Sequence, residues 1–294
     1  ETAFESIFRF DFSSYFEGSL EDIFENFEQN KFWEIKPNLS HEKFDKEKAK
    51  EYAKQYYELL EDAVRIRLRA DVKVGSALSG GLDSSSIVYL VNKLLKEQGK
   101  EELQETFSSV YKSDGTQDCD ESYFIDIMAL KLGVHSNQIE PKEDEIPSQI
   151  EKMIWHLENP PDNSLMSSWH TFKLVASTDV KVTLDGQGAD EQLGGYLPYL
   201  LNYISSLSIV DMFSQAKKCL QIPNSSKYVF VGLCLGLYRV LFGEKFLKFT
   251  IKKIFKRDFE TNLNKKLGIE TMSSLITLIH YADHTSMAFS IESR

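Results

Sequence analysis

The chain has 294 residues, 42% of them hydrophobic, and a formal net charge of −11 at pH 7. This size allows one large domain or two small ones, and the acidic balance disfavours a general nucleic-acid-binding protein. Three widely spaced cysteines, Cys119, Cys219 and Cys234, form neither a disulfide framework nor a metal-binding spacing, which indicates a reducing compartment such as the cytoplasm.

Residues 1–44 read as a lead-in segment, rich in phenylalanine and acidic residues and weak in periodicity. The chain begins with Glu1 in place of Met and shows no signal peptide, so we expect a fragment or a processed chain. The clearest helix is predicted over 45–70, where apolar residues recur every three or four positions. Three arginines crowd its last turn, where cations suit the helix dipole.

The stretch Val72–Ser86 joins an apolar strand, a glycine turn and the start of a helix. We predict a buried strand over 72–78 and a helix from residue 84 to about residue 96. Gly80 and Gly81 let backbone N–H groups approach a ligand, and the helix N-terminus adds unpaired donors and a partial positive charge. Further donors come from the hydroxyls of Ser79, Ser84 and Ser85.

Phosphate is the natural ligand of such a turn. A glycine turn between a strand and a helix is common, but the run Ser-Gly-Gly-Leu-Asp-Ser-Ser after an apolar strand is much more specific. It is not a Walker A loop, because no Lys-Ser/Thr follows the glycines. Asp83 would repel a phosphate unless a bound Mg²⁺ relieved the repulsion. The stretch therefore predicts a site for ATP together with Mg²⁺.

Strands and helices alternate through the next hundred residues. Strands are predicted over 106–111 and 135–139, separated by an apolar helix over 122–132 that Gly133 closes. A loop with two prolines over 158–164 precedes a helix from about residue 167 to residue 176. This order indicates a parallel sheet with crossover helices.

A second glycine-rich loop, Asp185–Tyr196, follows a buried strand predicted over 181–184. Ligands of open parallel sheets bind at the carboxyl ends of the strands, so we expect both glycine loops to face one crevice. Asp190 and Glu191 supply carboxylates to this loop. The alternative is an ordinary acidic turn, which two such loops in one chain make less favoured.

Residues 197–294 carry helical spacing and almost no strand signal. Val229–Leu237 is apolar but too short to span a bilayer, and we predict a buried helix and no membrane span. Phe246–Arg257 is basic and amphipathic, for which a solvated face is favoured over contact with an anionic surface.

The predicted fold class is α/β, an open parallel sheet flanked by helices with a helical C-terminal half. The expected organisation is a lead-in over 1–44, a nucleotide-binding α/β region over 45–196, and a helical region over 197–294 that packs at the carboxyl edge of the sheet. Antiparallel pairing of the strands at 72–78 and 181–184 would contradict this fold.

The first loop resembles the pyrophosphate loop of the ATP pyrophosphatase (adenine nucleotide α-hydrolase) group. Together with Asp-Gly-Gln-Gly-Ala-Asp-Glu, the following Gly-Gly-Tyr and the closing Ser-Met-Ala-Phe-Ser-Ile-Glu-Ser-Arg, it resembles the synthetase domain of glutamine-dependent asparagine synthetases. The resemblance runs from about Lys31 to Arg294, and the segments 120–122 and 158–164 match more weakly.

This resemblance implies an enzyme that activates a carboxylate, usually that of aspartate, with MgATP. An acyl-adenylate forms, pyrophosphate leaves, and ammonia displaces AMP. It also implies roles for individual residues. The pyrophosphate portion of ATP would be held by Ser79, Gly80, Gly81, Asp83, Ser84 and Ser85, and adenosine would be bordered by Leu78, Val110 and Gly186. Asp83 and Asp190 would hold Mg²⁺, and Gln187 would join them as a catalytic residue in the place where many members have Glu.

The chain departs from the family in ways that leave alternatives open. No glutaminase domain is recognised, so ammonia would come free or from a glutaminase domain or subunit, and a homodimer is one assembly the resemblance allows. Relatives continue beyond residue 294 with a lysine thought to stabilise developing charge. Ala282, His284 and Thr285 replace more polar residues. The alternatives are an amidotransferase acting on another carboxylate, such as a sugar acid, or a nucleotide-binding subunit without turnover.

Overall fold

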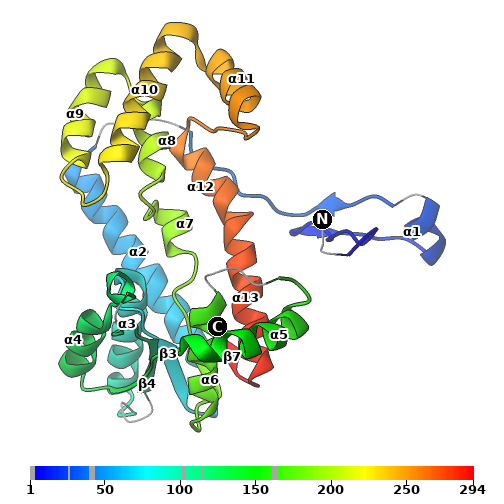
Figure 1. The fold of residues 1–294 in the computed structure, drawn as a ribbon, viewed down its shortest axis with the longest axis vertical. Coiled ribbons are helices and arrows are strands. Elements are labelled where there is room, and N and C mark those ends of the chain that lie inside the picture. Colours follow the sequence, from blue (N-terminus) through cyan, green and yellow to red (C-terminus); the bar gives the residue numbers. More distant parts are fainter. Residues whose placement is uncertain (1–3, 26, 40–43, 101–103, 114, 161–164) are drawn as a thin grey trace. The chain divides into compact units, whose positions relative to one another are not determined.

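The computed structural model describes residues 4–25, 27–39, 44–100, 104–113, 115–160 and 165–294 (Figure 1). The chain divides into two compact units. The sheet unit comprises Glu42–Gln187 and Ile276–Arg294, and the helical unit comprises Glu1–His41 and Gly188–Leu275. The boundary between the units falls inside the second glycine loop.

A five-stranded sheet forms the centre of the sheet unit, in the order β5-β4-β3-β6-β7 with every neighbouring pair parallel. This confirms the predicted open parallel sheet, including the parallel pairing of β3 with β6, in which Val74 lies opposite Val182. The strands are β3 (Val74–Ala77), β4 (Gln104–Ser109), β5 (His135–Ile139), β6 (Val182–Leu184) and β7 (Glu292–Ser293).

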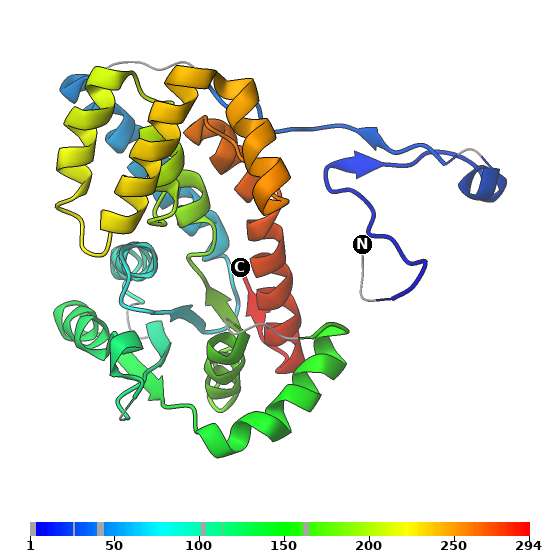
Figure 2. The ribbon, with the colours of Figure 1, turned by 45° about the horizontal axis from the view of Figure 1, so that its top comes forward.

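The edge strand β7 was not predicted. The expectation of a helical chain after residue 197 is wrong for these two residues, because Glu292 pairs with Val182 and Ser293 with Thr183. A Glu-Ser pair carries no strand propensity of its own. It is extended because the helix before it, α13 (Ser274–Ala288), delivers it to the open edge of β6 (Figure 2).

Helices cover both faces of this sheet. On one face, α2 (Lys46–Arg67) and α3 (Leu82–Glu97) enclose a core in which Val74 and Val182 pack with Val91 of α3 and Val64 of α2. On the other face, α6 (Leu165–Ala176) packs on β4. The predicted helix over 45–70 thus begins and ends near its observed bounds, with Asp45 capping its N-terminus by accepting from the N–H groups of the first turn.

The remaining helices of the sheet unit lie beside these layers. Helix α4 ends at Gly133 in the left-handed conformation, as its sequence predicted. Met153, Leu157 and Trp169 form a buried cluster that joins α5 and α6. The elements are η2 (Gln117–Cys119), α4 (Ser122–Leu132), η3 (Glu143–Glu145) and α5 (Ile146–Leu157). Of the proline-containing segment 158–164, residues 161–164 lie outside the described residues.

The helical unit has its own core, built from Ile204, Met212 and Val229. Helix α10 packs tightly here because it presents glycine to its neighbours: a Cβ at Gly236 would collide with the Met212 sulfur. The elements are β1 (Ser14–Tyr15), α1 (Leu20–Glu25), β2 (Asn30–Lys31), α7 (Ala189–Leu193), α8 (Tyr199–Ser206), α9 (Ile209–Cys219), α10 (Ser226–Phe242), α11 (Glu244–Phe255) and α12 (Leu263–Thr271).

Helix α10 is not the buried helix that its apolar sequence predicted. Its buried residues are Val229, Gly232 and Gly236, whereas Phe230 is 67% exposed and Leu241 is 74% exposed. Its core face is therefore a narrow strip of small side chains, and an apolar face remains uncovered. Within the part of the chain that the structure describes, no helix is long and apolar enough to cross a membrane.

Candidate nucleotide-binding site

The first glycine loop connects β3 to α3 and leaves the start of this helix open. Gly80 has φ +87°, a conformation that favours glycine, and Gly81 occupies the N-cap position of α3. Because Gly81 has no side chain, no capping side-chain hydrogen bond forms. The first N–H groups of α3 are therefore left for a ligand, and the helix dipole makes that position favourable for an anion.

Ser84 shapes this loop from inside. Its Oγ accepts a hydrogen bond from the Ser79 N–H at 3.2 Å, lies 3.0 Å from the Ser79 Oγ, and donates to the Gly81 carbonyl at 3.2 Å. Ser84 is buried, whereas Ser79 is exposed and Ser85 is half-buried. Of the three predicted hydroxyls, that of Ser84 thus holds the turn, and those of Ser79 and Ser85 are more accessible.

The other side of the turn rests on the start of α4. A Cβ at Gly80 would lie 3.1 Å from the Glu121 carbonyl oxygen, so only glycine fits without displacing α4. Asp120 fixes this contact, since its carboxylate accepts from the Tyr111 N–H at 3.1 Å and from the Ser122 Oγ at 2.7 Å. These hydrogen bonds lower the pKa of Asp120, the one from Ser122 most, whereas burial raises the pKa of Glu121.

The beginning of the second glycine loop lies against the first. A Cβ at Gly186 would stand 3.3 Å from the Ser84 backbone nitrogen and 3.6 Å from the Asp83 Cβ. All three residues belong to the sheet unit: Asp83 and Ser84 follow strand β3, and Gly186 follows the neighbouring strand β6. Gln187, the next residue, is exposed. The structure thus brings Gly186 to the phosphate turn, as expected for strands that end at the same edge.

Two of the three predicted adenosine neighbours, Leu78 and Val110, are buried together. Leu78 is 1% exposed and Val110 is 4% exposed, and they share a cluster with Val88 and Ile125. They lie at the ends of the adjacent strands β3 and β4. This cluster forms the apolar floor behind the phosphate turn.

The rest of the second loop belongs to the helical unit and is built on glycine. Gly188 (φ +101°) and Gly194 (φ +74°) flank the short helix α7. A Cβ at Gly195 would overlap the Asp190 carboxylate, so this glycine makes room for the aspartate. Asp190 is half-buried. The Gly-Gly pair therefore sets the position of Asp190 within its own loop.

Glu191, a candidate carboxylate in the sequence, is committed to its own loop. It is 1% exposed and accepts a hydrogen bond from the Tyr196 hydroxyl at 2.8 Å. Burial, with the Glu191 bond second, raises the pKa of Tyr196, and burial followed by the Glu270 carboxylate raises the pKa of Tyr199 to about 12. Both hydroxyls thus stay protonated at neutral pH and can only donate to a carboxylate.

Asp185 was not singled out by the sequence, although it opens the second loop. Its carboxylate accepts a hydrogen bond from the Ser293 Oγ at 2.6 Å, and burial raises its pKa against the opposing effect of that bond. Ser293 belongs to β7. The bond therefore joins the second loop to the closing segment, and no local pattern could have shown it.

The closing Glu-Ser-Arg also acts through the fold. Arg294 donates from Nη1 to the backbone carbonyls of Arg67 and Arg69, at 2.7 and 2.9 Å, and from Nε to Glu292 at 2.8 Å. Its guanidinium thus caps the C-terminal carbonyls of α2. In this structure, the part of the closing motif that the resemblance singled out ties β7 to α2.

A groove of about 430 Å³ adjoins the phosphate turn in the sheet unit. Tyr56, Tyr57 and Tyr89 line it, together with Leu82 and Ser85 from the start of α3. Burial raises the pKa of Tyr56, with the Asp83 carboxylate as the smaller second cause, so Asp83 lies near this side of the groove. The lining is completed by Ala53, Leu60, Ser86, Leu90 and Met128.

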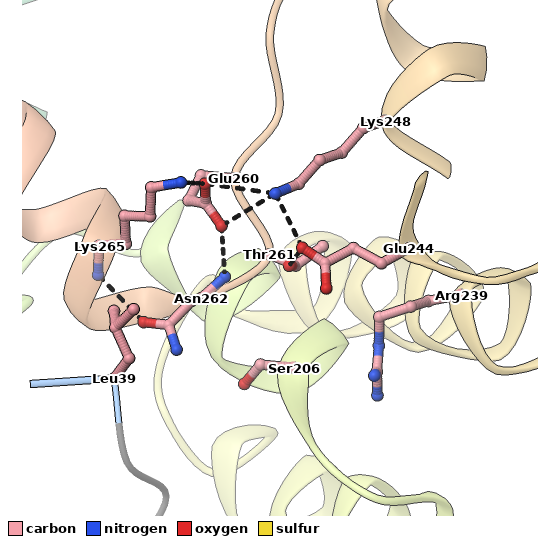
Figure 3. A pocket seen from close by; sticks show the side chains of 9 residues that line it. All are labelled: Leu39, Ser206, Arg239, Glu244, Lys248, Glu260, Thr261, Asn262 and Lys265. Carbon is pink, nitrogen blue, oxygen red and sulfur yellow. Dashed lines mark hydrogen bonds and ion pairs between the residues drawn. The ribbon is translucent and has the colours of Figure 1, made fainter. Parts of the chain in front are cut away.

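A cavity of about 360 Å³ in the helical unit is charged instead (Figure 3). Lys248 lies between two carboxylates, 2.8 Å from Glu244 and 3.3 Å from Glu260, and Lys265 approaches Glu260 at 2.9 Å. Thr261 donates to Glu244 at 2.8 Å. Both lysines are thus paired with carboxylates, and the third cation of the lining, Arg239, donates to the backbone carbonyls of Ser205 and Leu207. We interpret the cavity as a structural network of ion pairs and hydrogen bonds.

The Mg²⁺ ligands predicted by resemblance lie on different units, Asp83 on the sheet unit and Asp190 on the helical unit. Asp83 stands in the first turn of α3, beside the open N–H groups, and so fits a cation that accompanies a phosphate. Among the residues described, no group of three or more His, Cys, Asp or Glu side chains is placed so that it could hold a metal ion by itself. Mg²⁺ commonly takes only one or two carboxylates and completes its shell with phosphate and water oxygens.

Comparison with known proteins finds similar sequences. The amidase chyE of Penicillium rubens is 32% identical over 189 residues, covering 60% of this chain and 27% of that protein. The putative asparagine synthetase (glutamine-hydrolyzing) 2 of Methanocaldococcus jannaschii is 33% identical over 162 residues, covering 54% and 29%. Asparagine synthetase (glutamine-hydrolyzing) 1 of Bacillus subtilis is 30% identical over 146 residues, covering 50% and 22%.

These matches span less than a third of the length of each relative. The profile of the asparagine synthase family matches residues 55–294, which is most of the chain. That range contains both glycine loops and the closing segment. The chain therefore belongs to the asparagine synthase family.

Proposed function

We propose that this chain is the synthetase portion of an amide ligase that binds ATP with Mg²⁺, activates a carboxylate as an acyl-adenylate and releases pyrophosphate. Ammonia then displaces AMP to form the amide. The observation that carries this proposal is the phosphate turn, where a left-handed Gly80 and an uncapped α3 present backbone N–H groups beside Gly186.

Different residues are proposed to bind the pyrophosphate and the adenosine of ATP. The pyrophosphate would lie on Ser79, Gly80, Gly81 and the first turn of α3, whose donors are oriented before the ligand arrives. Leu78 and Val110 would form the apolar floor for adenosine, with Gly186 beside it. Preorganised donors favour the negative charge that develops on the leaving pyrophosphate.

Asp83 and Asp190 are the proposed Mg²⁺ ligands, and Gln187 is the proposed catalytic side chain between them in sequence. When bound, Mg²⁺ would supply the charge neutralisation that phosphate oxygens require. The exposed amide of Gln187 can donate to and accept from a substrate without adding another negative charge near the phosphates.

The acceptor is proposed to be aspartate, and the nitrogen donor free ammonia or ammonia from a glutaminase domain or subunit. A second candidate is amidation of another carboxylate, such as a sugar acid, because the similar proteins are not all named asparagine synthetase: those of Penicillium rubens and Gibberella zeae are named amidase. Both names refer to amide chemistry, but only one of them specifies asparagine.

Pyrophosphate release tests the proposal. The chain is mixed with ATP, Mg²⁺ and ammonium, and with aspartate, each member of a panel of sugar acids, or no carboxylate. Carboxylate-dependent release of pyrophosphate and AMP is expected for one acceptor. Release with a sugar acid alone would select the second candidate. ATP binding without release for any acceptor would instead support a nucleotide-binding subunit without turnover.

A further inference from the structure

Helix α11 has two different faces. One face is built into the helical unit, since Leu247 is 2% exposed and Lys248 joins the ion-pair network with Glu244 and Glu260. The other face carries Phe246 and Phe249, which are 49% and 61% exposed. A phenylalanine left this exposed on a helix that already has a packed face calls for a partner.

The exposed rings form a continuous aromatic ladder across the turn between α10 and α11. Tyr238 and Phe242 of α10 have ring centroids 4.8 Å apart, Phe242 and Phe246 lie 6.0 Å apart, and Phe246 and Phe249 lie 6.4 Å apart. Phe242 is 59% exposed. The ladder is therefore an organised apolar surface and not a set of isolated side chains.

Helix α10 adds an apolar stripe next to this ladder. Phe230, Cys234, Leu237 and Leu241 are exposed and recur at spacings of four, three and four residues, which places them on one helix face. We call the ladder, this stripe and the exposed face of α11 the α10–α11 elbow. Both helices pack on each other, as Figure 1 shows for the helical unit.

Basic side chains border the ladder on α11. The residues Lys245, Phe249 and Lys252 are spaced by four and three positions, so these two lysines share a face with an exposed ring, although Lys252 also pairs with Asp258 at 3.0 Å. The exposed Lys256 follows at the left-handed C-cap of the helix. Further exposed cations on and just after the helix are Lys253 and Arg257. This basic cluster stands out because the whole chain has a net charge of −11.

We propose that the α10–α11 elbow docks onto the surface of an anionic lipid bilayer. The rings and the apolar stripe would enter the boundary between headgroups and acyl chains, and the lysines would lie among the anionic headgroups, which is how interfacial amphipathic helices bind. Charge complementarity selects this partner, since a patch that is apolar in its centre and basic at its border matches such a surface.

Other partners fit less well. A symmetric pair of chains would place two copies of the lysine cluster in one interface, where the added like charge is unfavourable. A single-stranded nucleic acid needs rings available for base stacking, whereas these rings already contact one another and adjoin the apolar stripe of α10. The inference does not depend on the proposed enzymatic activity, because the elbow contains none of the residues assigned to the nucleotide site.

Co-sedimentation with vesicles tests the proposal. The chain is mixed with vesicles of phosphatidylcholine alone and of phosphatidylcholine with phosphatidylglycerol. Binding is expected only with the anionic vesicles and is expected to weaken as salt is added. Two double variants, Phe246→Ser with Phe249→Ser and Lys252→Glu with Lys253→Glu, are each expected to weaken binding at least about tenfold. All four side chains are exposed, so both variants should keep the wild-type circular dichroism and melting temperature.

The matched control is Lys217→Glu with Lys218→Glu, which makes the same charge change on exposed lysines of α9. It is expected to bind as the wild type does. An equal loss in the control would show a general charge effect and overturn the proposal. Failure to bind anionic vesicles would also overturn it, as would a dimer in sedimentation velocity that the Phe246/Phe249 variant dissolves, or tight binding to single-stranded DNA.

Discussion

At the scale of single residues, the backbone at Gly80 is the feature on which the proposed ATP site most depends. We predict that Gly80→Ala will weaken ATP binding at least about tenfold and lower the free energy of unfolding by about 1–2 kcal/mol, because alanine is strained at φ +87° and its Cβ would press on Glu121. Isothermal titration calorimetry and urea unfolding measure the two effects.

Gly99→Ala provides the control, since Gly99 also has a positive φ of +65° but no atom of the described residues lies within 4 Å of its Cβ position. It should lose a similar amount of stability from strain alone and keep its affinity for ATP. If Gly80→Ala bound ATP normally, the phosphate turn would not be the nucleotide site.

Asp83 and Asp190 supply the second prediction at this scale. We predict that Asp83→Asn and Asp190→Asn will each weaken Mg²⁺-dependent ATP binding and abolish pyrophosphate release, because the amide is a weaker Mg²⁺ ligand than the carboxylate. The double variant is expected to lose less than the sum of the two, because both carboxylates would act on one MgATP complex.

Calorimetric titration of ATP with and without Mg²⁺ measures these losses. Asp258→Asn is the control, because Asp258 is an exposed aspartate whose side chain pairs with Lys252 at 3.0 Å. A single variant with unchanged Mg²⁺-dependent affinity would remove that aspartate from the list of ligands. Strictly additive losses would show that the two side chains act separately.

At the scale of elements, Glu260 links α11 to α12. Burial raises its pKa, but hydrogen bonds from Lys265, the Asn262 N–H and Lys248 together outweigh burial, so that the folded pKa lies below the usual value of 4.5. A carboxyl whose pKa is lower in the folded state stabilises the fold above its unfolded pKa, and loses that contribution as the pH falls through the folded value.

We therefore predict that Glu260→Gln will lower the free energy of unfolding at pH 7 by about 1–3 kcal/mol, since Lys248 and Lys265 lose a shared and largely buried partner. The difference from the wild type should shrink at pH values below about 4. Urea unfolding across this range measures it. Glu58→Gln, which removes a wholly exposed pair with Lys54 at 3.8 Å, should change stability by less than about 0.5 kcal/mol.

The elements themselves could largely be predicted from local patterns. The strand over 135–139 and the helix over 122–132 have the predicted bounds, because turn residues such as Gly133 mark their ends. Strand β7 and the exposure of α10 could not be predicted in the same way. Strand β7 exists through its partner β6, and the exposure of α10 depends on which of its faces finds neighbours, which an evenly apolar sequence does not encode.

At the scale of the whole chain, the site residues also divide into those predictable from local sequence and those that depend on distant contacts. The phosphate turn could be predicted because two consecutive glycines between a strand and a helix are typical of such a turn. The parallel order of the strands then brings Gly186 beside Ser84. Both Glu121 and Asp185 lie in segments that the resemblance covers, but their contacts with Gly80 and Ser293 could not be predicted, because each contact joins segments far apart in the chain. The basic character of Phe246–Arg257 is evident in the sequence, where it favours a solvated face, whereas the aromatic ladder beside it is evident only in the structure.

Whether this chain can take nitrogen from glutamine depends on whether one of its three cysteines can act as a nucleophile. Glutamine hydrolysis by a thiol needs an activated thiolate with a base beside it. Cys219 is buried, and burial raises the pKa of its thiol, while Cys119 and Cys234 are exposed. In the described parts of the chain, none of the three thiols takes part in a hydrogen bond.

We predict that this 294-residue chain releases no glutamate from glutamine, whereas ammonium supports amide formation with ATP and the preferred carboxylate. A coupled glutamate assay measures the first outcome, and amide formation with ammonium confirms in the same preparation that the protein is active. Glutamate release that Cys119→Ser or Cys234→Ser removes would reveal a thiol nucleophile that the structure does not show in a reactive setting. Release that survives both substitutions would assign glutamine hydrolysis to Cys219 or to a different chemistry in this chain, and either result would overturn the dependence on ammonia.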